Sequence, residues 1–195
     1  MEFVREPGVD YAPTLQESTV LAGDAGTLLR AFPSDFFRCC VTSPPYWGLR
    51  DYGTENQIGA EDDPQDYIDR LTAVFREVMR VLRPDGTLWL NLGDSYTSGN
   101  RGYRAPDKKH PVRAMSYRAK PPDGLKAKDL VGIPWRVAFA LQADGWYLRS
   151  DIIWEKPNCM PESVKDRPTR AHEYIFLMSK SVRYHYDPEG IREFN

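Results

Sequence analysis

The sequence predicts an α/β protein whose sheet is mostly parallel, with an antiparallel strand late in the chain. Apolar strand-like runs alternate with helix-like patterns from residue 19 to residue 156, which is typical of a parallel sheet covered by helices. The last two strand-like runs lie closer together and permit an antiparallel pair. With 195 residues, no internal repeat and no linker, we expect residues 1–195 to form a single domain.

The first elements are short. Residues 19–22 are expected to form a strand, followed by a turn at Gly23-Asp24 and a short helix. The run "FRCCVT" (37–42) is predicted to be the next strand. Apart from Arg38 it is mostly apolar, as expected for a strand that is covered on both faces.

The clearest helix spans residues 63–83. Asp63 is a candidate cap and Pro64 suits the first helical position. Apolar side chains then recur at helical spacing: Ile68, Leu71, Val74, Phe75, Val78, Val81 and Leu82. The "RPDG" turn breaks this helix, and residues 87–94 are predicted to form a buried strand.

Three further elements complete the predicted fold. A second helix is expected over 134–145, and strands over 146–156 and 173–181, separated by a Pro-containing loop. His172-Glu173, at the start of the last strand, is either a functional pair or an ordinary cap or salt bridge, and the second interpretation is favoured.

A long segment without periodicity, residues 95–128, precedes the second helix. Such a loop in a compact domain is usually functional or disordered. Residues 101–136 contain ten Lys/Arg and three Asp, a local charge of +7 in a chain of net charge −2. This asymmetry favours contact with a polyanion.

Three predicted strand ends carry candidate ligand-binding residues, because ligands of open α/β sheets bind beyond the carboxyl ends of the strands. Two of these ends are Gly-Asp pairs, at 23–24 and 93–94, for which a turn or a helix cap is the simpler explanation. The third is Ser-Pro-Pro-Tyr-Trp (43–47). Neither proline can donate to a sheet, so they end the strand in a rigid lip that bears a hydroxyl and two rings.

The segment "TSPPYWGL" (42–49) resembles the catalytic motif of amino-group DNA methyltransferases, (Asp/Asn/Ser)-Pro-Pro-(Tyr/Phe/Trp). The segments "VLAGDA", "YIDRLTAVFREVMRVLRPDGTLWLNLGDS", "GWYLRSDIIWEKPNCMPES" and "DRPTRAHEYIFLMSKS" are similar to the β arrangement of this family, in which the motif precedes the S-adenosylmethionine (AdoMet) loop. Together these segments cover nearly the whole chain from Thr19 onward.

The resemblance implies a Rossmann-like AdoMet-dependent methyltransferase of restriction-modification type that acts on double-stranded DNA. It makes Ser43, Pro44, Pro45 and Tyr46 the catalytic residues, with the base stacked on Tyr46. Asp24 and Thr42 become the candidate AdoMet contacts. The candidate DNA contacts are Trp47, Arg101, Arg104, Lys108, Lys109, Arg113 and Arg118.

The reaction implied is methyl transfer from AdoMet to the exocyclic amino group of a flipped base. Serine at the first motif position favours cytosine N4 as the acceptor. Two alternatives stay open: an adenine-N6 methyltransferase, and a non-catalytic DNA-binding remnant. Cytosine-C5 methylation is excluded, since it needs a cysteine nucleophile, usually from a Pro-Cys pair, and the chain contains no Pro-Cys.

The chain departs from the family in lacking a Phe-x-Gly-x-Gly AdoMet loop. In the family order, the strand at 19–22 would then lose its neighbours, leaving a gap between it and the strand at 37–42. We therefore expect an incomplete sheet in a truncated chain, a split enzyme or a degenerate relative. The missing C-terminal region or a second polypeptide would supply the AdoMet loop.

Other classes find little support in the sequence. Three cysteines form no C-x-x-C, and the three histidines share no ligand spacing with them, so no metal site is predicted. The apolar runs are far shorter than the ~20 residues that span a membrane, and the N-terminus lacks a secretory h-region. We expect a cytoplasmic protein with reduced thiols.

Overall fold

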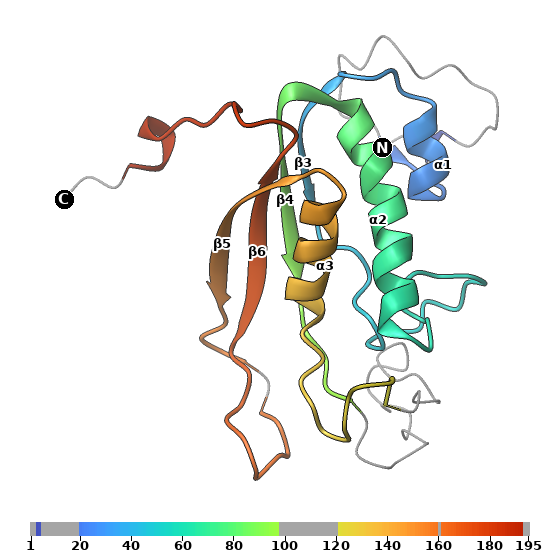
Figure 1. Ribbon diagram of the computed structural model, residues 1–195, viewed down its shortest axis with the longest axis vertical. Helices are drawn as coiled ribbons and strands as arrows, with labels where there is room; N and C mark the ends of the chain where they lie inside the picture. The colour runs from blue at the N-terminus through green and yellow to red at the C-terminus, as the bar shows by residue number, and fades with distance from the viewer. Residues whose placement is uncertain (1–2, 5–19, 98–120, 160, 193–195) are drawn as a thin grey trace.

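The computed structural model describes residues 3–4, 20–97, 121–159 and 161–192 (Figure 1). Its main body is a four-stranded sheet with the strand order β3-β4-β6-β5. The strands of this sheet are β3 (Phe37–Thr42), β4 (Leu82–Leu92), β5 (Tyr147–Glu155) and β6 (His172–Ser179). The helices are α1 (Ala25–Arg30), α2 (Pro64–Val81), α3 (Ile133–Ala143) and the short 3-10 turn η2 (Glu189–Ile191).

Strand directions in this sheet confirm the predicted arrangement. β3 pairs with β4 in parallel, whereas β6 is antiparallel to both β4 and β5. Three strands therefore run in one direction and β6 alone opposes them. The carboxyl ends of β3 and β4 consequently lie at the same edge of the sheet as the amino end of β6.

The strand predicted at 19–22 lies apart from this sheet. It forms β2 (Val20–Leu21), which pairs in parallel with β1 (Phe3–Val4) in a separate two-stranded sheet. Within the described residues no strand joins β2 to β3, as expected from the missing neighbours.

Helix α2 begins where the sequence predicts. The Asp63 carboxylate accepts a hydrogen bond from the Gln65 backbone N–H, and Pro64 occupies the first turn. Helices α2 and α3 lie side by side over one face of the sheet (Figure 1). An ion pair between Arg76 and Asp144 joins the middle of α2 to the end of α3.

The hydrophobic core lies between these two helices and the sheet. Leu88, Leu90 and Leu92 are fully buried on the helix-covered face of β4. On the neighbouring strand, Met178 and Phe176 pair with Leu88 and Leu90 and are equally buried. Because successive side chains of a strand point to opposite faces, every second side chain of β4 and β6 enters this core.

The opposite face of the sheet differs from the expectation for β3. The run 37–42 was predicted to be covered on both faces, but Val41 is 79% exposed and Cys39 is also exposed. Their neighbour Cys40, on the other face, packs against the core. The prediction was wrong because only one face of β3 meets a helix layer within the described residues.

No helix in the described ranges has both the length and the apolar character needed to cross a membrane.

One-sided coverage of the sheet predicts unequal costs of truncation. Leu90→Ala should lower the free energy of unfolding by about 2–5 kcal/mol, because it opens a cavity in the core. Val41→Ala, on the exposed face of the adjacent strand, should change it by about 0.5 kcal/mol or less. Urea unfolding measures both values, and equal costs would contradict the one-sided core.

Candidate functional site

The Ser-Pro-Pro-Tyr segment lies where three strand ends meet. It follows the last residue of β3, beside the end of β4 and the start of β6. Ser43 is exposed, Pro44, Pro45 and Tyr46 are half-buried, and Trp47 is buried. The segment is therefore anchored at one end and open at the serine.

The Tyr46 hydroxyl is the centre of a hydrogen-bond network across these strand ends. Its oxygen lies 2.6 Å from Asn91 Oδ1, on β4, and 3.0 Å from Glu173 Oε2, on β6. Ser43 Oγ lies 3.2 Å from the same phenol oxygen and 3.3 Å from Asn91 Oδ1. One phenol thus joins side chains from all three strands.

Two further contacts fix the acceptors of this network. The Asn91 amide nitrogen donates to the Tyr174 carbonyl over 3.3 Å, which turns Oδ1 toward the hydroxyls. Lys156, just after β5, forms an ion pair with the other carboxylate oxygen of Glu173. Burial raises the pKa of Tyr46 to about 12, so its phenol is protonated at neutral pH.

Pro45 and Trp47 are held from the helix side of the segment. Tyr67, fully buried in the first turns of α2, donates its hydroxyl to the Pro45 carbonyl over 2.9 Å. The buried Trp47 donates its indole N–H to the Glu61 carbonyl, and Ser95 donates to the Trp47 carbonyl. These bonds leave the segment little freedom to move.

The close approach of the Tyr46 ring to the backbone requires glycine at position 93. A Cβ added there would lie 2.5 Å from Cε2 of Tyr46, well inside contact distance. The Tyr46 ring therefore packs directly against the backbone at the end of β4. Gly93 positions the ring, which the phenol network then orients.

Both Gly-Asp pairs serve as helix caps. The Asp24 carboxylate accepts hydrogen bonds from the backbone N–H and the hydroxyl of Thr27, and the backbone bond lowers its pKa. The buried Asp94 carboxylate accepts backbone N–H bonds from Ser95, Gly132 and Ile133 at the start of α3. It also faces Arg170 at 3.4 Å. Of the two pairs, only Asp24 was a candidate AdoMet contact, and Oδ1 of its carboxylate is occupied by the cap.

The predicted DNA contacts are largely outside the described residues. Arg101, Arg104, Lys108, Lys109, Arg113 and Arg118 all fall within 98–120. Trp47 is described, but it is 7% exposed and packed in the core, so this arrangement gives no support to its contact with DNA.

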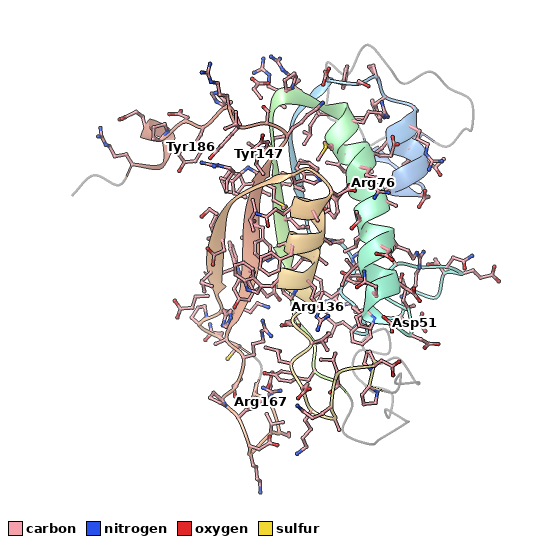
Figure 2. The ribbon with its side chains drawn as sticks, in the orientation of Figure 1. Asp51, Arg76, Arg136, Tyr147, Arg167 and Tyr186 are labelled. Carbon is pink, nitrogen blue, oxygen red and sulfur yellow. The ribbon has the colours of Figure 1, made fainter. Side chains whose placement is uncertain are left out.

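Two other basic side chains lie toward the end of the sheet that carries the Ser-Pro-Pro-Tyr segment. Figure 2 shows Arg136 and Arg167 toward the end of the sheet where β4 and β5 finish. The Arg167 guanidinium stacks 3.8 Å from the Tyr96 ring centroid and pairs with Glu162. Arg136 is anchored by its bond to the Val131 carbonyl. Arg167 thus ties the segment after β5 to the segment after β4.

Several site residues were not identified from the sequence. Tyr67 and Asn91 lie in segments whose periodicity explains them as parts of a helix and a strand, so pattern alone gives no signal for their roles. Lys156 was assigned only to a strand end. Glu173 was noted beside His172, and it forms both the expected salt bridge and a contact with the Ser-Pro-Pro-Tyr segment.

Across the described parts of the chain, no group of three or more His, Cys, Asp or Glu residues is arranged to hold a metal ion.

Residues 37–195 match the profile of a known protein family, described as DNA methylase, of the N6/N4 type. The chain belongs to this family. The match begins at β3 and includes the Ser-Pro-Pro-Tyr segment and the Asn91 and Glu173 positions.

A much closer likeness is found to a named relative. The chain is 64% identical over 179 residues to the type II methyltransferase M.Cfr9I of Citrobacter freundii. The aligned region covers 92% of this chain but 60% of the relative. The chain therefore spans less than two thirds of the length of that protein.

Solved structures of methyltransferases share the fold. The cytosine-N4-specific PvuII DNA methyltransferase superposes with a TM-score of 0.59 at 19% identity, over 89% of this chain and 54% of that one. TTHA0409 of Thermus thermophilus, a putative DNA modification methylase complexed with AdoMet, gives 0.56 at 24% identity, over 86% and 55%. The fold is thus the Rossmann-like fold of AdoMet-dependent methyltransferases, represented here in part.

The contact between Gly93 and Tyr46 generates a test. Gly93→Ala should lower the free energy of unfolding by about 1–3 kcal/mol, because the new methyl group displaces the Tyr46 ring. The matched control is Gly26→Ala in α1, where the added methyl meets only an Asp24 oxygen at 3.5 Å and favours the helix. Urea unfolding of both variants is the measurement, and a neutral Gly93→Ala would contradict the described packing.

Proposed function

We propose that this chain carries the base-binding half of a DNA amino-methyltransferase, which transfers a methyl group from AdoMet to cytosine N4. The observation that carries the proposal is the exposed Ser43 hydroxyl at the end of β3, held by Tyr46 and Asn91. The serine-first motif and the likeness to M.Cfr9I support it.

The chemistry follows from the acceptor atoms at this edge. An exocyclic amino group is a poor nucleophile because its lone pair is delocalised into the ring. Ser43 Oγ and the Pro44 carbonyl accept hydrogen bonds from its two N–H groups and localise that lone pair on nitrogen. Positioning then supplies most of the rate, and no covalent enzyme intermediate is needed.

The base must leave the duplex to reach this edge, because the amino group of a paired base is not accessible in the stack. The half-buried Tyr46 ring is the proposed stacking surface for the extruded base. Basic residues of 98–120, together with Arg136 and Arg167, are the proposed contacts to the DNA backbone.

AdoMet supplies the electrophilic methyl group when it is bound. The described residues do not make up its site alone: Thr42 is a half-buried strand residue, and Oδ1 of Asp24 already caps α1. We propose that polypeptide beyond this chain, either a continuation or a second polypeptide, completes the cofactor site. The edge strand β3, with Val41 exposed, offers an open side for its docking.

Replacing the proposed acceptor tests the function. In the chain co-expressed with the part of M.Cfr9I that it does not match, Ser43→Ala should reduce methyl transfer from labelled AdoMet to unmethylated DNA by about 10²-fold or more, while DNA affinity stays within about twofold. Mass analysis of the digested nucleosides should show N4-methylcytosine for the wild-type protein. Undiminished transfer by Ser43→Ala would contradict the catalytic assignment, and N6-methyladenine would contradict the assigned base.

Supplying the missing region tests the partnership. The chain co-expressed with the part of M.Cfr9I that it does not match should gain methyl transfer relative to the chain alone. Full activity of the chain alone would contradict the need for further polypeptide. The chain co-expressed with an unrelated protein of similar size is the control.

A further inference from the structure

The hydrogen-bond network around Tyr46 contains more acceptors than donors, and this imbalance fixes where each proton points. Asn91 Oδ1 and the Glu173 carboxylate can only accept, whereas the hydroxyls of Ser43 and Tyr46 carry one proton each. The Asn91 amide is fixed by its bond to the Tyr174 carbonyl, and the Glu173 carboxylate pairs with Lys156.

The Tyr46 proton is committed to these acceptors. Asn91 Oδ1 at 2.6 Å and Glu173 Oε2 at 3.0 Å both compete for it. The phenol oxygen therefore presents only lone pairs to Ser43. Asn91 Oδ1 is the other neighbour of Ser43, so the two side-chain groups that the described residues place beside the serine hydroxyl both accept its proton.

We propose that Tyr46 is a positioning residue through its hydroxyl. Together with Asn91 and Glu173 it draws the Ser43 proton inward, so that the Ser43 lone pairs face the amino group of the base. This inference rests on the proposed function. The family motif also accepts Phe or Trp at this position, and neither carries a hydroxyl, so the motif itself implies only stacking by the ring. The proposed role of the Tyr46 hydroxyl is additional to that stacking.

The ionisation of the phenol is consistent with this geometry. Burial raises the pKa of Tyr46 to about 12, the hydrogen bond from Ser43 lowers it, and the Glu173 carboxylate raises it again. The phenol thus keeps its proton throughout the neutral range, as the network requires.

Kinetics separate the hydroxyl from the ring. In the chain co-expressed with the unmatched part of M.Cfr9I, Tyr46→Phe keeps the ring and should reduce kcat by about tenfold or more, with KM for DNA changed by less than about twofold. Glu173→Gln should also reduce kcat, but should have little further effect in the Tyr46→Phe background, because both variants break the same network. Glu155→Gln, an exposed glutamate on the adjacent strand, is the control. Wild-type kcat for Tyr46→Phe, or additive losses, would overturn the proposal.

A second measurement needs no methyl transfer. NMR of protein with ¹³C-labelled tyrosine follows each of the 11 tyrosines against pH, and Tyr46 is the signal lost in Tyr46→Phe. The Tyr46 signal should remain unshifted up to about pH 11, and should begin to titrate at lower pH in Glu173→Gln. Titration of wild-type Tyr46 near the ordinary value of about 10 would overturn the inference. Absent methyl transfer with the expected titration would instead count against the proposed function alone.

Discussion

The phenol of Tyr46 is the interaction on which the rest of the site depends. It binds side chains from β4 and β6 while belonging to the segment that follows β3. These strands are adjacent in the order β3-β4-β6, so one hydroxyl group links the ends of three neighbouring strands. Without it, the exposed Ser43 would have only Asn91 to orient its hydroxyl.

Much of the fold was predictable because it follows from local patterns. The cap at Asp63 and the helical spacing after it place α2, and apolar strand-like runs locate β4, β5 and β6. The covering of β3 was not predictable. Its composition indicates a strand with two buried faces, but burial depends on a second layer of structure that no local pattern reveals. The exposed Val41 is consistent with a sheet represented only in part.

The candidate site likewise contains residues that could be predicted from the sequence and residues that could not. The Ser-Pro-Pro-Tyr segment was recognisable because two prolines after an apolar run are rare and have a direct steric consequence. Tyr67, Asn91 and Lys156 were not, because each reaches the site across the tertiary structure from an element of ordinary appearance. Asp94 shows the converse: a suggestive Gly-Asp at a strand end turns out to cap α3.

In the proposed arrangement the Ser43 proton points into the network and its lone pairs point outward. Neutron diffraction from a deuterated crystal measures this most directly, because it locates the deuterons on both hydroxyls. We expect the Ser43 deuteron to be directed at Tyr46 Oη or Asn91 Oδ1, and the Tyr46 deuteron to be directed at Asn91 or Glu173. A Ser43 deuteron directed to solvent would contradict this arrangement.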